Sequence, residues 1–521
     1  MLRYSTLILT LLFCSIAPIA RAQTETIAPG HLVVVYRNGI IPTNAAANIA
    51  ASGAHITKSI AHFGIVAVST SPATEATIQA NLAAQPGVAL VLRDRFVTAH
   101  ALQFPTLKVT PKPGRPSPVS PVSINPLPPI LPAPIHPLQP PGPIADTDYN
   151  SPQGWAILQS GGYGNNIPNA ANNPTGPWNI SMGAGVRIAV LDSGVDAAHP
   201  DIAPNLALNL SEIDQSAQSG LPSACDDGSP QDQQGHGTFT ASLATGALGA
   251  STGLIVGVAP QATLLNIKVL QRMPGTGATP TAACEAGEAA GLLSWVLQGI
   301  DDAVANHANV ISLSLGTLID ITTGDGAGWQ STFNSATYAA SQSGTVIVAA
   351  LGNDSLNLSG TLIELPAQSR GVLPVIASTN PACGEDLTPN ATCIPGPVTM
   401  PSYSNYGAAN AIAAPGGSYP EGVAISGFVT GACSSGLPNT TDGLPLNGQS
   451  FGCFGLGHVQ YLQAIGTSAS APLVAAAAAI LHAAHTNWTA PQIVAALLST
   501  AIPTTNLPAP QLNLPAALAL P

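Results

Sequence analysis

The sequence has few charged side chains. Asp, Glu, Lys and Arg make up 7% of its 521 residues, against roughly 25% in an ordinary soluble domain. Cations are the scarcer kind, with 13 Lys and Arg against 25 Asp and Glu and a formal net charge of −12. A chain without a basic cluster lacks the surface that nucleic-acid binding requires, so we exclude nucleic acid as a partner. The 51 glycines and 49 prolines follow no Gly-X-Y period, which excludes collagen.

Long hydrophobic runs are also scarce, and the one at the N-terminus predicts an export signal. Residues 1–22 contain Arg3, an apolar run over 7–20 and a closing Ala-Arg-Ala. This order is typical of a secretory signal peptide that is cut before Gln23. A membrane anchor is the alternative, although the run is shorter than the roughly 20 residues that a bilayer requires. We therefore expect a secreted protein, extracellular or periplasmic, with no membrane contact after the signal is removed.

Six cysteines remain after that cut, an even number in a chain expected to be exported. Disulfides are the default interpretation, and six cysteines allow 15 pairings. Proximity in the sequence favours three pairs: Cys383 with Cys393, Cys433 with Cys453, and Cys225 with Cys284. Metal binding is the competing interpretation, but no Cys-x-x-Cys or Cys/His spacing supports it.

Residues 23–104 alternate between strand-like and helical segments. The apolar or alternating runs favour strands and the Ala-rich stretches favour helices. In chain order they lie at 32–36, 43–52, 65–68, 72–85 and 88–92. This order suggests a small α+β unit of βαββαβ type.

Residues 105–145 differ sharply in composition from what precedes them. They include 15 prolines between 105 and 143 and show no apolar periodicity. Such a segment forms neither a helix nor a sheet ladder, and we expect an extended proline-rich linker. A ligand for proline-recognising domains is the alternative.

From 146 to 521 the chain is expected to form an α/β domain, a mostly parallel sheet flanked by helices. Short, continuous, β-branched runs are typical of strands buried on both faces, and helical stretches lie between several of them. The strand candidates are 186–191, 263–269, 310–315, 345–350 and 372–377, and the helix candidates include 288–306 and 331–343.

Three short motifs carry candidate chemistry. Asp192 ends a buried strand before Ser193-Gly194, at the edge of a sheet where sites form. His236 lies between two glycines that allow a tight entry into a helix. Ser468, in Gly-Thr-Ser-Ala-Ser, precedes an Ala-rich helix. Taken singly, a turn-capping Asp, an incidental His and an N-cap Ser are ordinary structural interpretations.

Taken together, these motifs resemble the subtilisin-like (subtilase) serine protease family, in which they occur in this chain order. The resemblance covers roughly residues 150–505, and residues 30–96 are more loosely similar to the family's inhibitor-like propeptide. Further matching blocks lie at 256–260, 264–270, 310–316, 346–353, 403–407 and 413–416. A segment at 426–463 looks like an insertion.

The resemblance implies a serine endopeptidase made as a zymogen, acting on polypeptides through an acyl-enzyme and requiring no cofactor. Ser468 would be the nucleophile, His236 its base and Asp192 the group that orients the imidazole. Asn353 matches the oxyanion-hole side chain. Residues 23–104 would be the propeptide and an intramolecular inhibitor. Structural calcium is frequent in the family, but no ligand set can be assigned here.

The resemblance also points to a primary specificity pocket. Its two walls match Ser314, Leu315 and Gly316, and Ala350, Leu351 and Gly352. All six are small or apolar and none is charged, so we expect a preference for a large apolar residue before the scissile bond.

Two other functions remain as alternatives. One is a latent or non-catalytic subtilase-like binding module, which the complete set of Asp192, His236, Ser468 and Asn353 argues against. The other is an acid-active peptidase of the sedolisin type, which would need Glu in place of His236.

The scarcity of charge is uneven along the chain. Residues 146–521 contain 4 basic and 22 acidic residues, a net charge of −18, whereas residues 23–145 contain 7 basic and 3 acidic, a net charge of +4. Opposite signs favour the encounter of propeptide and enzyme. So few cations also leave little positive charge to drive unfolding in acid, and we expect the protein to remain folded at low pH.

Overall fold

The computed structural model describes residues 27–102, 154–164, 176–249, 253–379, 398–418, 427–434, 453–454, 456 and 459–521. The expected signal peptide, the whole proline-rich linker, the Cys383–Cys393 pair and most of the 426–463 insertion lie outside these residues.

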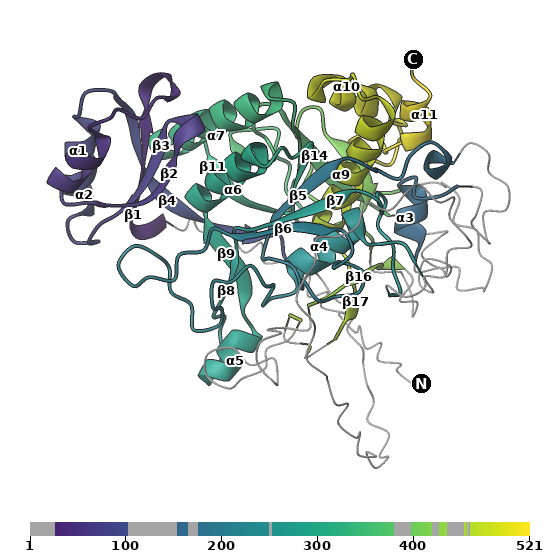
Figure 1. Cartoon of the computed structure of the whole chain (residues 1–521), viewed down its shortest axis with the longest axis horizontal. Helices are drawn as coiled ribbons and strands as arrows, with labels where there is room; N and C mark the ends of the chain where they lie inside the picture. The colour runs from purple at the N-terminus through teal and green to yellow at the C-terminus, as the bar shows by residue number, and fades with distance from the viewer. Residues whose placement is uncertain are drawn as a thin grey trace, which may run out of the picture.

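The N-terminal domain, residues 27–102, has the predicted βαββαβ order. Its strands form an antiparallel sheet in the order β2-β3-β1-β4. The elements are β1 (Ile27–Tyr36), α1 (Ala45–Ala51), β2 (His55–Ile60), β3 (Ile65–Ser69), α2 (Glu75–Ala83) and β4 (Val88–Ala99). Figure 1 shows this domain in purple at one end of the molecule.

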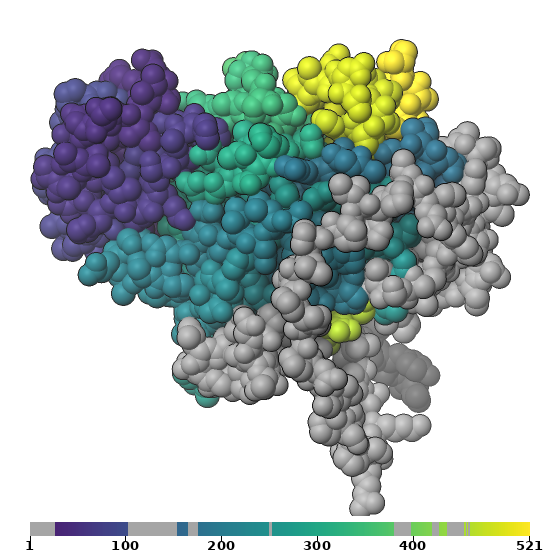
Figure 2. All heavy atoms as spheres, in the orientation of Figure 1, coloured from purple at the N-terminus to yellow at the C-terminus, as the bar shows by residue number. Residues whose placement is uncertain are grey.

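Both faces of this small sheet are buried, which explains the continuous apolar run of β1. Leu32 and Val34 pack with the domain's own helices. Val33, one residue out of phase, belongs to the same core as α6 (Leu293–Ala305) and α7 (Gly324–Gln342) of the following domain. Alternate residues of a strand point to opposite faces, so the sheet docks on the larger domain through a second apolar surface. The space-filling view shows the two parts in continuous contact (Figure 2).

The larger domain is built on a seven-stranded sheet in the order β15-β14-β12-β10-β5-β7-β6. Every neighbouring pair in it is parallel. The strands are β5 (Arg187–Asp192), β6 (Leu206–Ser211), β7 (Thr263–Lys268), β10 (Val310–Leu313), β12 (Val346–Ala350), β14 (Val372–Ser378) and β15 (Ile412–Pro415). All five predicted strands are present, and the fold class predicted from the sequence is confirmed.

Helices cover both faces of this sheet. Ile188 and Val190 of β5 pack in one core with α4 (His236–Thr245) and α9 (Thr467–Ala484), whereas Ala189 and Leu191 pack in the other with α6 and α7. The described part of this domain also contains α3 (Trp155–Gln159), α5 (Pro280–Glu285), α10 (Ala490–Thr500) and α11 (Leu514–Leu518). The helix predicted from 288 begins at Leu293, because residues 288–292 pair as a strand instead.

Helix α9 is long and apolar enough to cross a membrane by length and composition, but 83% of its apolar window is buried inside the protein. Its alanines, from Ala475 to Ala479, are fully buried in the core beneath the sheet. Short side chains let this helix approach the strands closely, so we interpret it as a core helix.

A second set of strands joins the two domains. Strand β4 continues beyond its own sheet and runs between β9 (Glu288–Leu292) and β11 (Leu315–Asp320). On the far side, β11 pairs with β13 (Leu362–Leu365), and β9 pairs with β8 (Gln271–Met273). A separate hairpin consists of β16 (Val429–Ala432) and β17 (Tyr461–Ala464). Two predicted disulfides, Cys225–Cys284 and Cys433–Cys453, are confirmed.

Candidate active site

The fold brings the three motif residues to one end of the parallel sheet. Asp192 is the last residue of β5, His236 the first of α4 and Ser468 the second of α9. All three are at most 1% exposed. The glycines around His236 are required: Gly235 has a φ of 112°, and a Cβ at Gly237 would overlap the Gly194 carbonyl oxygen.

Asp192 holds one side of the His236 ring. His236 Nδ1 lies 2.8 Å from Asp192 Oδ1 and 2.9 Å from Oδ2. The carboxylate also accepts hydrogen bonds from Ser193 N at 2.7 Å and Thr240 Oγ1 at 3.1 Å. These contacts favour the tautomer with the proton on Nδ1, so Nε2 can accept a proton. His236 Nε2 has no hydrogen-bond partner among the described residues.

The Ser468 hydroxyl faces a peptide carbonyl. Its Oγ donates toward His100 O at 3.2 Å and Ser314 O at 3.3 Å. No hydrogen bond between Ser468 Oγ and His236 Nε2 occurs in the described part of the chain. Such a contact is often loose in resting sites and tightens during reaction. The hydroxyl therefore lies against the group that a nucleophile would attack.

Asn353 lies beside the same peptide on the loop after β12. Its Oδ1 accepts hydrogen bonds from Thr467 N at 2.9 Å and Thr467 Oγ1 at 2.8 Å. Its Nδ2 is thereby directed at the bound segment, where it donates to Ala101 O at 2.9 Å. The amide can stabilise negative charge that develops on a nearby oxygen.

The bound segment is the end of the N-terminal domain, added as a strand. Thr98 pairs with Gly316 of β11 and with Ala290 of β9, and Ala99 pairs with Leu315. The next residue continues the ladder, with His100 N donating to Ser314 O at 3.2 Å. Strand addition of this kind is how an extended peptide binds to a sheet edge.

Three of the six predicted pocket residues, Gly316, Ala350 and Gly352, lie against the His100 side chain. A Cβ added at Gly316 would come within 2.9 Å of His100 Cε1, and one at Gly352 within 3.4 Å. His100 Nε2 lies 3.2 Å from Ala350 O. The imidazole thus lies between the two predicted walls, Ser314, Leu315 and Gly316 on one side and Ala350, Leu351 and Gly352 on the other, and we call this space the primary pocket.

The primary pocket contains an ionisable residue that the sequence analysis did not anticipate. Glu364 of β13 is 1% exposed, and its Oε1 lies 3.6 Å from His100 Nε2. Burial, with a smaller contribution from Asp354, raises the pKa of the Glu364 carboxyl well above its usual range. Burial also lowers the pKa of His100 to about 4. Burial therefore favours the neutral form of both groups.

Sequence reasoning missed Glu364 because the walls come from β10–β11 and β12, whereas the floor comes from β13. One signal was available. Glu364 interrupts the apolar run 362–366, and a carboxyl inside a buried strand is rare unless it has a partner.

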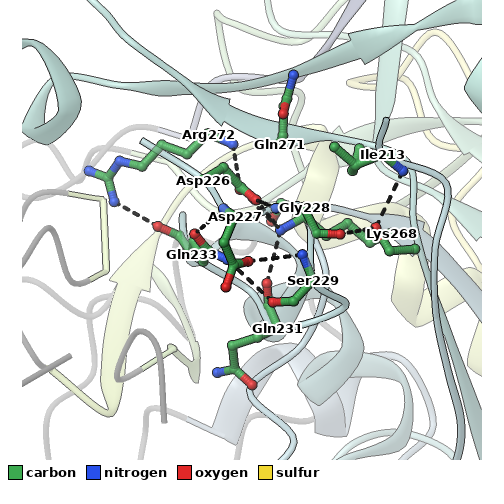
Figure 3. A network of polar contacts seen from close by, with 12 residues as sticks. Ile213, Asp226, Asp227, Gly228, Ser229, Gln231, Gln233, Lys268, Gln271 and Arg272 are labelled. Carbon is green, nitrogen blue, oxygen red and sulfur yellow. Dashed lines mark hydrogen bonds and ion pairs between the residues drawn. The ribbon is translucent and has the colours of Figure 1, made fainter. Parts of the chain in front are cut away.

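A buried polar network supports the loop that leads to His236 (Figure 3). Lys268 Nζ lies 2.8 Å from Asp226 Oδ1 and 2.9 Å from Gln231 O, and Arg272 N donates to Asp226 Oδ2 at 2.8 Å. Both cationic side chains are fully buried. Asp232, on the same loop, accepts hydrogen bonds from Thr238 N at 2.9 Å and Gly235 N at 2.8 Å. The network therefore fixes the start of α4.

Among the described residues, no group of three or more His, Cys, Asp and Glu is arranged to hold a metal ion. Structural calcium stays an expectation from the family resemblance.

Comparisons with known proteins agree with this geometry. Residues 183–516 match the Subtilase family. Thermitase of Thermoactinomyces vulgaris is 34% identical over 239 residues, 46% of this chain and 66% of thermitase. Subtilisin amylosacchariticus of Bacillus subtilis subsp. amylosacchariticus is 29% identical over 321 residues, 61% of this chain and 61% of the relative. The chain therefore spans about two thirds or less of the length of these curated relatives.

Two solved structures share the fold. Fervidolysin from Fervidobacterium pennivorans, a keratinolytic enzyme related to subtilisin, aligns with a TM-score of 0.58 and 19% identity over 95% of this chain and 61% of its own. EpiP from Staphylococcus aureus, an epidermin leader peptide processing serine protease, aligns with a TM-score of 0.59 and 16% identity over 94% of this chain and 97% of its own.

Proposed function

Because the chain belongs to the subtilase family, we propose that it is a serine endopeptidase that hydrolyses polypeptides with Asp192, His236 and Ser468. The observation that carries the proposal is the contact of Ser468 Oγ with the His100 carbonyl, in a segment bound as an added strand beside an Asp192–His236 pair. Nucleophile, base, orienting carboxylate and peptide meet at one point.

The chemistry follows from the roles of these groups. His236 Nε2 takes the hydroxyl proton as Ser468 Oγ attacks the peptide carbonyl carbon, and Asp192 stabilises the imidazolium that results. The C–N bond then breaks, and His236 returns the proton to the leaving amine. Water attacks the acyl-enzyme by the same route, with His236 again as base. Neither step needs a cofactor.

Asn353 is assigned to the oxyanion. Its Nδ2 donates to the carbonyl that follows His100, one peptide unit from the attacked group. In the reaction it would turn to the developing oxyanion together with Ser468 N. A side-chain donor in this position is worth about 3–4 kcal/mol of transition-state energy.

We also propose that the N-terminal domain is a propeptide that inhibits the enzyme until it is removed. Contacts across the interface support this, because each joins a basic side chain of that domain to an acid of the larger one. Lys58 lies 2.8 Å from Glu212, His62 lies 2.6 Å from Asp301, and Arg93 lies 2.7 Å from Asp325. This polarity agrees with the opposite net charges of the two regions.

The bond between His100 and Ala101 is the proposed maturation site, because its carbonyl faces Ser468. Cleavage there would detach the inhibitory domain from the proline-rich linker. The signal peptide over 1–22, secretion and the domain boundaries remain part of the same proposal, supported by the sequence. The earlier expectation of a large apolar residue before the scissile bond considered the walls alone, and Glu364 argues against it.

Casein hydrolysis tests the proposed activity. The chain from 23 to 521 and its Ser468→Ala variant are compared with Ser470→Ala, which removes a hydroxyl from the same helix that has no partner among the described residues. We expect the parent and Ser470→Ala to cleave casein and Ser468→Ala to lose at least about 10³-fold in rate. Equal activity in all three, or none in any, would favour the latent binding module instead.

A further inference from the structure

Glu364 is a buried carboxyl group whose position is difficult to explain by stability alone. It lies on β13, where it pairs with Leu318 of β11, and its side chain is 2% exposed. Its Oε2 has no hydrogen-bond partner among the described residues. A buried polar group without a partner costs free energy, about 1–3 kcal/mol. An apolar residue in this strand would avoid that cost.

The carboxyl forms the floor of the primary pocket. A Cβ built on Gly316 would overlap Glu364 Oε1 on one side and come within 2.9 Å of His100 Cε1 on the other. Gly316 therefore separates the Glu364 carboxyl from the His100 ring, and its lack of a side chain lets the two groups approach each other. Ala350 O can only accept, so His100 Nε2, 3.2 Å away, carries the proton and donates it to that carbonyl. Glu364 Oε1 lies 3.6 Å from the same nitrogen.

We propose that Glu364 determines specificity in this site, and that the primary pocket selects a residue of moderate size with a hydrogen-bond donor, histidine first, before the scissile bond. This inference rests on the proposed endopeptidase function. The chain itself carries a matching residue, His100, directly before the bond proposed for maturation.

Two physical effects reject the other classes of side chain. A large apolar residue would reach the floor and cover the carboxyl without offering it a donor, and a site built for a hydrogen bond discriminates strongly against such a ligand. An acidic residue would lie close to the Asp354 carboxylate, whose charge already acts on both Glu364 and His100. The walls alone give no reason for either rejection.

A peptide series tests the proposal on the processed enzyme. Substrates identical except for His, Gln, Phe, Leu or Glu before the scissile bond are compared by kcat/KM. We expect the parent enzyme to favour His over Phe by at least about 10-fold and to cleave the Glu peptide least. Glu364→Ala removes the floor, so the His-to-Phe ratio should invert, while Glu364→Gln keeps an acceptor of the same size and should retain most of the preference for His. Glu285→Ala, an exposed acid at the end of α5, is the matched control and should not change the ratio.

A double-mutant cycle on self-processing gives a second readout that does not depend on added substrates. His100→Phe should slow self-processing at least about 10-fold in the parent, and Glu364→Ala should restore it in the double variant. A His-to-Phe ratio that is the same in the parent and Glu364→Ala, with casein still cleaved, would overturn the proposal. If the parent enzyme does not cleave casein, the proposed endopeptidase function, on which this inference rests, would be refuted instead.

Discussion

The two domains use their few cations in opposite ways. In the N-terminal domain, Lys58 and Arg93 are 20% and 40% exposed and pair with acids across the interface. In the larger domain, Lys268 and Arg272 are fully buried and hold the loop that leads to His236. Only Arg187 and Arg370, both exposed, remain of its four basic residues. The buried cations of the larger domain therefore support the site, whereas those of the smaller domain form partly exposed ion pairs across the interface.

The largest expected effect comes from breaking the buried set. Lys268→Met leaves the Asp226 carboxylate buried without its main partner, and removing one member of a buried ion pair costs about 3–5 kcal/mol. We expect a loss of that size in the free energy of unfolding in urea, measured on the Ser468→Ala background. The double variant Lys268→Met with Asp226→Asn should recover part of the loss, and no recovery would argue that Lys268 acts mainly through packing.

The second largest expected effect is a dependence of stability on pH. Burial, reinforced by the neighbouring Glu212, raises the pKa of Asp302 to about 7, and burial raises the pKa of Asp94 to about 6. Both values lie above the roughly 3.9 of an unfolded Asp, so the folded chain binds more protons between about pH 4 and 7. The buried carboxyls Asp226, Asp232 and Asp301 also have raised pKa values, and together these groups outnumber His100, whose lowered pKa acts in the opposite direction. The free energy of unfolding should therefore rise as the pH falls through that window.

Urea midpoints of the Ser468→Ala chain at pH 7 and pH 5 measure this, with the higher midpoint expected at pH 5. Asp302→Asn should flatten the dependence, whereas Glu288→Gln, an exposed acid on β9, should not. Loss of stability between pH 7 and 5 would contradict both this prediction and the expected survival in acid.

Replacing the cations at the interface should have a smaller effect, on the dissociation of the N-terminal domain. Lys58→Ala and Arg93→Ala each remove a partly exposed ion pair, worth about 0.2–1 kcal/mol. After self-cleavage, the N-terminal domain should dissociate up to about 5-fold more readily in each variant, and added salt should reduce the difference. Size-exclusion chromatography at two salt concentrations measures this. Arg37→Ala, a cation of the same domain outside these pairs, is the control, and an equal change there would show that net charge alone matters.

The smallest effect is expected for the exposed cations of the larger domain. Arg370 lies over the Tyr338 ring, with its guanidinium carbon 3.6 Å from the ring centroid, and Arg187 donates to Asn306 O at 3.0 Å. Alanine at either position should change stability by about 0.5 kcal/mol or less, as surface substitutions do. A loss near that of Lys268→Met would remove the contrast between buried and exposed cations.

Local sequence patterns predicted the features that depend on short segments. Asp192, His236 and Ser468 each lie in a motif of a few residues at the start or end of an element, so their positions could be read without knowing the fold. The βαββαβ order and the strands of the parallel sheet follow from periodicity in the same way.

Features assembled from distant segments could not be predicted in this way. The primary pocket has its walls near 315 and 351, its floor at Glu364 and its occupant at His100. No local pattern reports that β4 inserts between β9 and β11, and the apolar preference was inferred from an incomplete pocket for this reason. No local pattern marks Lys268 as a buried ion-pair residue either, because its partner Asp226 lies 42 residues away in the sequence.

The central claim is that Ser468 acts on the peptide bond that the N-terminal domain presents to it. N-terminal sequencing of the products from the purified chain and from its Ser468→Ala variant tests this directly. We predict a new terminus at Ala101 in the parent chain and no such terminus in the variant. The same terminus in both, or parent cleavage that leaves the bond between His100 and Ala101 intact, would contradict the account.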